Sequence, residues 1–127
     1  MGTTTWSPLA SGLLSGKYGK TIPSDSRLNV PGYEWLKEDF YANDGEKINK
    51  VELLKEIANE MSCSMASLSI AWCAANPNVS SVILGASNED QLVENIKSLD
   101  IIEKLDQSVF DKIDSVVGNK PNEPRKY

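Results

Sequence analysis

The sequence lacks several features that mark particular classes of protein. It contains no histidine, and its two cysteines, Cys63 and Cys73, do not follow the spacing of a metal site. No apolar run reaches roughly 18 residues, so we expect no segment that spans a membrane. The first residues have neither the basic region nor the apolar core of a signal peptide, and we expect none.

Positive charge is also scarce. Lysine and arginine total 13 against 18 aspartates and glutamates, which gives a formal net charge of −5 and a pI of about 4.7. A general binder of nucleic acid or anionic membranes would carry a basic face, so we expect neither partner. Both cysteines lie in apolar helical patterns, where thiols are usually buried and reduced, and this favours the cytosol.

Two short strand-like segments alternate with longer helical ones. Residues 3–9 favour a strand that ends at Ser7-Pro8, and residues 79–84 favour a second strand with a buried apolar end. Between them we expect a loop or short helical turn at 10–18, a long loop at 19–44 with a short helix near 33–41, and helices at 46–61 and 64–75. After the second strand we expect helices at 88–99 and 106–117 and a loose polar tail at 119–127.

The expected helices carry capping signals and apolar faces. Ser64 suits an N-cap, Ser87 and Asn88 each precede an acidic or amide residue by three positions, and Gly118 suits a C-cap. The faces predicted to point inward comprise Ile48, Val51, Leu54, Ile57, Ala58 and Met61 in the first long helix, Leu68, Ala71 and Trp72 in the next, and Leu92, Ile96 and Leu99 in the third.

The separation of the two strands, about 70 residues, indicates parallel pairing with helices on the outside. A sheet of two strands is marginal alone, so the pattern is typical of the end of a larger α/β domain. A (β/α)₈ barrel has about 250 residues, and this chain would be roughly its second half. The fold class expected is therefore α/β, an incomplete barrel of about two strands with their helices.

Two segments carry candidate chemistry. Residues 6–12 follow a strand end, where an aromatic ring, hydroxyls and exposed amides would suit a ring-bearing ligand with phosphates. Residues 85–95 run from a strand end through Gly85 into a helix N-terminus, which is a ready anion site. Each segment also has a purely structural interpretation: an ordinary turn for the first, and helix capping with a solvated polar face for the second. Glu89 and Asp90 would repel a phosphate, so cations such as Lys17 and Arg27 would have to assist.

Together these segments resemble the aldo-keto reductase family. The run Trp6-Ser7-Pro8-Leu9-Ala10-Ser11-Gly12 resembles its cofactor loop, and Gly85-Ala86-Ser87-Asn88 with Gln91, Glu94 and Asn95 resembles its adenine-end motif. Within the family, the run ending Gly118-Asn119-Lys120-Pro121 is most similar to the β subunits of shaker-type voltage-gated potassium channels. The resemblance covers nearly the whole chain and identifies it as the C-terminal portion of a single NADP-dependent oxidoreductase domain, residues 1–127.

The resemblance implies a cofactor, NADPH, and a role for each matching residue. The residues implied to hold it are Trp6, Ser7, Pro8, Leu9, Ala10 and Ser11 along the nicotinamide and pyrophosphate, Lys17 and Arg27 on phosphate oxygens, Ser87 and Gln91 around the 2′-phosphate, Glu94 and Asn95 at the adenine, and Gly85 at the start of the adenine-end motif. The channel subunits have cysteine at position 11 and tyrosine at position 25, where this chain has Ser11 and Asp25. Asp25 adds a negative charge near the implied phosphate.

The resemblance also implies what the chain does and what it lacks. The family's catalytic tyrosine, aspartate and lysine would lie upstream, so no residue here is assigned a catalytic role. A whole subunit would be a cytoplasmic homotetramer that reduces small aldehydes or ketones and modulates a voltage-gated potassium channel α subunit from its cytoplasmic side, at the plasma membrane through the channel complex. An ordinary NADPH-dependent reductase without a channel partner, and a truncated product without enzymatic activity, stay open as alternatives.

Overall fold

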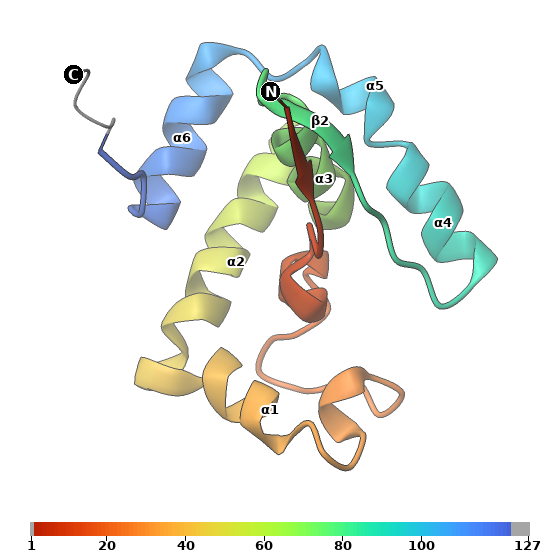
Figure 1. The fold of residues 1–127 in the computed structure, drawn as a ribbon. Helices are drawn as coiled ribbons and strands as arrows, with labels where there is room; N and C mark the ends of the chain where they lie inside the picture. Colours follow the sequence, from red (N-terminus) through yellow and green to blue (C-terminus); the bar gives the residue numbers. More distant parts are fainter. Residues whose placement is uncertain (1, 123–127) are drawn as a thin grey trace.

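The computed structural model describes residues 2–122 and contains two strands with helices beside and behind them in the view of Figure 1. The strands are β1 (Thr3–Thr5) and β2 (Val79–Val82). The helices are η1 (Ala10–Ser15) and η2 (Arg27–Asn29), both of the 3₁₀ type, and α1 (Glu34–Phe40), α2 (Ala42–Glu60), α3 (Met65–Ala74), α4 (Glu89–Ile96), α5 (Leu99–Ile102) and α6 (Gln107–Val117). In Figure 1, α2 and α6 lie on one side of the strand pair and α4 and α5 on the other.

The two strands pair in parallel, as their separation in the sequence predicts. Thr3 pairs with Val79 and Thr5 with Val82, and the register is irregular between Thr3 and Thr4. Both strands are shorter than predicted. The first ends because the chain turns at Ser7, whose φ of 52° is not extended, and the last ladder bond joins Ile83 N to Thr5 O at 2.8 Å. The described residues thus form a mixed α/β structure with an open sheet of two parallel strands, and a closed barrel is not seen among them.

The main core lies between α2 and the elements packed on it. The helix begins with Asn43, Asp44 and Gly45 in left-handed geometry, so its regular part starts near Glu46, as predicted. Its predicted inward face is buried, except that Met61 is half-buried. The other buried core residues are Leu13, Tyr18, Leu28, Leu36, Phe40, Met65, Leu68 and Ile113. These residues join η1, α1, α3 and α6 to α2 through apolar contacts.

Local capping residues start and end the helices where the sequence predicts. Ser64 Oγ accepts a hydrogen bond from Ser67 N at 3.0 Å and starts α3. Asp106 caps α6 in the same way, and Gly118 ends that helix with a left-handed φ of 64°. Of the tail predicted at 119–127, residues 119–122 are exposed and irregular, and 123–127 lie outside the described residues.

Three predictions about burial are wrong. Leu92, Ile96 and Leu99 are exposed, Leu99 by 64%, and Trp72 on α3 is 43% exposed. The apolar end of the second strand, Ile83 and Leu84, is exposed as well. These side chains form apolar faces that residues 2–122 do not cover. The helix predicted at 88–99 is also divided: Ser98 N bonds to Asn95 O, three residues back, which tightens the chain and separates α4 from α5.

The two cysteines are free thiols and half-buried rather than fully buried. Burial raises the pKa of both thiols above its usual value. Among the described residues, no group of acidic and cysteine side chains is arranged to hold a metal ion. None of the helices in that part of the chain has the length and apolar character needed to cross a membrane.

Candidate functional site

The first component of the site is the coiled loop that follows β1. Ser7, Ala10 and Ser11 all have positive φ, between 47° and 59°, which is uncommon for residues other than glycine. The turns are held by Ala10 N to Ser7 O at 2.9 Å and by Gly12 N to Leu9 O at 2.9 Å. Ser7 Oγ also accepts from Ser11 N at 3.3 Å. Backbone kept in a sparsely populated conformation is a feature of binding sites, because surrounding contacts must maintain it.

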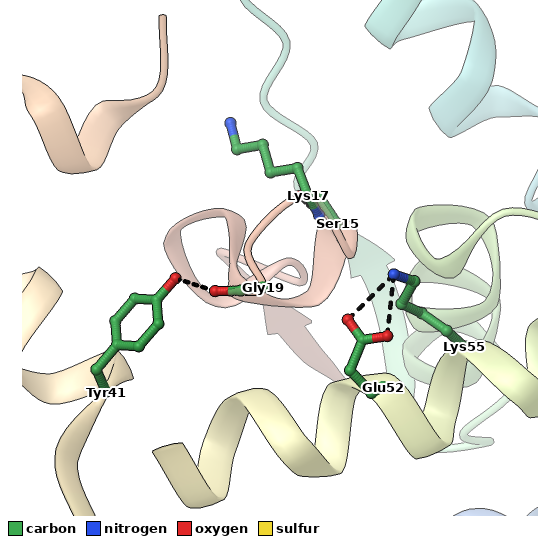
Figure 2. A network of polar contacts seen from close by, with 6 residues as sticks. All are labelled: Ser15, Lys17, Gly19, Tyr41, Glu52 and Lys55. Atoms are coloured by element: carbon green, nitrogen blue, oxygen red, sulfur yellow. Dashed lines mark hydrogen bonds and ion pairs between the residues drawn. The ribbon is translucent and has the colours of Figure 1, made fainter. Parts of the chain in front are cut away.

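The second component is a pair of cations, Lys17 and Arg27. Lys17 directly follows η1, and its Nζ lies 5.2 Å from the centre of the Tyr18 ring. Figure 2 shows its side chain extending away from α2, while Glu52 and Lys55 of that helix pair with each other at 3.1 Å. Arg27 begins η2, and its guanidinium lies 5.8 Å from the centre of the Tyr33 ring. Within residues 2–122 neither cation has a carboxylate partner within 4.0 Å, so both are available to an anion.

A tyrosine fixes the loop between these two cations. Tyr41 Oη donates to Gly19 O at 2.7 Å, as the dashed line in Figure 2 marks, and joins the end of α1 to the loop after Lys17. Burial is the main cause that raises the pKa of the Tyr41 hydroxyl, and the neighbouring Tyr18 raises it further. A neutral, hydrogen-bonded phenol in this place acts as a structural contact.

The third component is the segment from Gly85 into α4. Asn88 Oδ1 accepts from Gln91 N at 2.9 Å, and Gln91 Oε1 accepts from Ser87 N at 2.8 Å. This reciprocal arrangement resembles a capping box and satisfies two backbone donors. The structural role of helix capping therefore accounts for the side chain of Asn88 and for Oε1 of Gln91. Gln91 Nε2 and Ser87 Oγ form no hydrogen bond within the described residues and can donate to a ligand.

Glu94 and Asn95 are engaged with the protein itself. Asn95 is only 4% exposed, and its Nδ2 donates to Gly85 O at 3.3 Å, which ties α4 to the end of β2. Glu94 forms an ion pair with Lys97 at 2.8 Å and accepts from Ser67 Oγ at 3.3 Å. The hydrogen bond from Lys97 is the main cause that lowers the pKa of Glu94. Both residues consequently have a structural role besides any contact with a ligand.

These components surround one cleft of about 710 Å³. It is lined by eleven of the thirteen residues that the sequence resemblance singled out, namely Ser7, Pro8, Leu9, Ser11, Lys17, Arg27, Gly85, Ser87, Gln91, Glu94 and Asn95. The other two are Trp6 and Ala10. Trp6 is 79% exposed, and neither residue lines the cleft in residues 2–122. Ser7 and Asn95, which are 88 positions apart in the sequence, thus line the same cleft, and the parallel pairing of the strands helps to bring their segments together.

Sequence reasoning missed several residues that line the cleft. Ala66 and Ile70 of α3 lie one helical turn apart and contribute its apolar surface. Ser15 and Leu84 line it as well, and so do Gly12, Ala86 and Asn88, which belong to the two sequence motifs but were given no role. The helical spacing of Ala66 and Ile70 indicates only a buried face, so no chemical signal could have assigned them to the cleft.

The residues of the cleft suit a ligand that carries phosphate groups and an aromatic ring. Lys17 and Arg27, which have no carboxylate partner among residues 2–122, line it together with serine hydroxyls and an amide that can donate, and such a donor set can bind phosphate oxygens. Ala66, Ile70 and Leu9 provide an apolar surface on which a ring could lie. The acidic side chains of the cleft, Asp25 and Glu94, repel an anionic ligand. The affinity of the cleft for such a ligand therefore depends on Lys17 and Arg27.

The comparisons with known proteins agree with the resemblance. The model of the aldo/keto reductase family matches residues 1–117. A "Probable voltage-gated potassium channel subunit beta" of Oryza sativa subsp. japonica is 52% identical over 128 residues, and a protein of the same description from Arabidopsis thaliana is 51% identical over 128 residues. Each alignment covers 100% of this chain and 38% of the relative, so the chain spans well under half the length of these relatives. The chain belongs to the aldo/keto reductase family.

Proposed function

We propose that this chain is the C-terminal, NADPH-binding part of a cytoplasmic potassium-channel β subunit with an aldo-keto reductase fold. The observation that carries the proposal is the cleft itself, which Lys17 and Arg27 line together with Gly85, Ser87 and Gln91. Among residues 2–122 neither cation has a carboxylate partner within 4.0 Å. The family membership and the plant channel subunits at 51% to 52% identity support it independently.

The side chains of the cleft would divide the cofactor between them. Lys17 and Arg27 would bind phosphate oxygens, and the planar guanidinium of Arg27 suits the terminal 2′-phosphate, which it can contact with two parallel hydrogen bonds. Ser87 Oγ and Gln91 Nε2 would donate to the same phosphate, since neither atom forms a hydrogen bond within residues 2–122. The residues 7–12 would hold the nicotinamide end. NADPH would supply the hydride when bound, and this chain would orient it.

The role of Asn95 in this proposal is indirect. Its amide holds Gly85 O, so it would position the glycine segment against which the adenine end lies. Glu94 keeps one oxygen on Lys97 and would use the other at the adenine, where Ser67 now donates.

Cofactor titration tests the proposal. We would measure the dissociation constants of NADPH and NADH with the 127-residue chain and with a chimaera in which this chain replaces the matching segment of the rice relative. Arg27→Ala should weaken NADPH about tenfold to a hundredfold, since a charge-assisted hydrogen bond contributes about 1.5–3 kcal/mol, and it should change NADH little. Lys20→Ala is a matched control, because Lys20 is exposed in the same loop but does not line the cleft. Equal losses for both cofactors would show that Arg27 does not read the 2′-phosphate.

The channel partner needs a separate test. The chimaera should be retained by an immobilised tetramerisation domain of a voltage-gated potassium channel, as should the rice protein. If the rice protein is retained and the chimaera is not, the channel assignment for this chain is rejected and an ordinary reductase is favoured.

A further inference from the structure

The carboxylate of Asp25 is a negative charge in a cleft whose cations favour an anionic ligand. Lys17 and Arg27 are cationic, and two acidic residues, Asp25 and Glu94, line the cleft with them. The charge of Glu94 is compensated by Lys97 at 2.8 Å. Asp25 has no ion pair and no hydrogen-bond partner for its carboxylate within residues 2–122. Asp25 is therefore the uncompensated negative charge of an otherwise anion-binding site.

A tight turn holds Asp25 in this place. Ser26 N donates to Pro23 O at 3.1 Å, so Ser24 and Asp25 form the centre of a four-residue turn. Asn29 Nδ2 donates to the same Pro23 O at 2.7 Å, and Ser26 itself is only 3% exposed.

The turn also relates Asp25 to Arg27. The two residues flank the buried Ser26, both are exposed, and both line the cleft. One short loop thus presents a cation and an anion to the same ligand. A ligand phosphate bound by Arg27 would approach the carboxylate two residues away.

We propose that Asp25 determines cofactor specificity by lowering the preference of this cleft for a 2′-phosphorylated dinucleotide. The inference rests on the proposed function. A 2′-phosphate carries a charge of about −1.5 to −2 at neutral pH, and a nearby carboxylate repels it. NADH has a 2′-hydroxyl in the same position, which a carboxylate accepts as a hydrogen bond, as acidic residues do in other dinucleotide sites. Arg27 favours the phosphate and Asp25 opposes it, so the two residues set the ratio of the affinities.

The experiment measures that ratio in wild type and in Asp25→Asn. Dissociation constants are determined by calorimetry for NADPH and NADH, and for the shorter probes adenosine 2′,5′-bisphosphate and adenosine 5′-monophosphate, with both the 127-residue chain and the chimaera. Asp25→Asn should raise the preference for the 2′-phosphorylated member of each pair about threefold to tenfold, which corresponds to removing one like charge near a phosphate. The effect should shrink in high salt because exposed charges are screened.

The matched control is Glu38→Gln, which makes the same change in net charge at an exposed residue of α1 that does not line the cleft. A change in preference within about twofold for Asp25→Asn, or an equal change for Glu38→Gln, overturns the inference. Those outcomes leave the proposed function intact, because wild type still binds the dinucleotide. If wild type binds none of the four probes in either protein, the proposed function fails, and the inference fails with it.

Discussion

Gly16 allows a close contact between the coiled loop and the helices beneath it. It has a left-handed φ of 76° at the end of η1, immediately before Lys17. A Cβ atom at this position would lie 3.1 Å from Met65 Cβ and 3.3 Å from Lys55 Cδ. The lysine stem can move aside, but Met65 is buried in the core and begins α3. Substitution by alanine therefore meets both backbone strain and a steric contact.

Gly118 separates these two effects, because it has a similar φ of 64° and a Cβ there would meet nothing within 4 Å. Alanine in the left-handed region costs roughly 1–2 kcal/mol, partly offset by the lower entropy of the unfolded chain, so Gly118→Ala should lower the free energy of unfolding by about 1 kcal/mol. Gly16→Ala should lower it by about 2–3 kcal/mol, since forcing an extra methyl into packed structure adds about 1–3 kcal/mol.

Urea unfolding of both variants, followed by circular dichroism, checks the difference. The slope of the free energy against urea should stay constant, which shows that the change is in stability. Losses for the two variants that agree within about 0.5 kcal/mol would refute the steric part of the reasoning. Gly16→Ala should also lower the affinity for NADPH, because displacement of the loop moves Lys17. Gly118→Ala should leave this affinity unchanged.

Two further predictions concern α4. Asn95→Ala should lower the free energy of unfolding by about 1 kcal/mol, because it leaves Gly85 O without its donor, and thermal unfolding that matches wild type would show that this bond contributes nothing. Lys97→Ala should raise the pKa of Glu94 towards its ordinary value of 4.5, as measured by carboxyl NMR titration, and an unchanged pKa would contradict the assigned cause. Because the folded-state pKa is lowered, the pair stabilises the protein above the unfolded pKa, and this contribution disappears as the pH falls through the folded one.

The starts of α3, α4 and α6 could be predicted from the sequence because their causes are local. Ser64, Asn88 and Asp106 each cap a helix through a bond to the backbone three residues later. Such bonds depend on neighbouring residues alone. The inward face of α2 could be predicted for a similar reason, since its apolar positions recur over four turns.

Burial of the α4 face could not be predicted in this way. Leu92, Ile96 and Leu99 have the spacing of a core face, but whether such a face is covered depends on what packs against it from elsewhere. The residues of the cleft likewise fall into those that could be predicted and those that could not. Lys17 and Arg27 were found because charged residues in a known motif are conspicuous, whereas Ala66 and Ile70 are chemically ordinary, and only the tertiary structure brings them to the site.

The pairing of β1 with β2 has a consequence for when the cleft exists. Thr3 Oγ1 and Asn78 O, which meet at the start of the pair, are 75 residues apart in the sequence. Closing so long a loop costs chain entropy, whereas helices form from local bonds without this cost. The strands should therefore pair late in folding. Since the cleft is assembled from the ends of both strands, only molecules that have completed this step can bind. Ligand binding and strand pairing are thus linked equilibria, and a bound dinucleotide would stabilise the pairing of β1 with β2 by mass action.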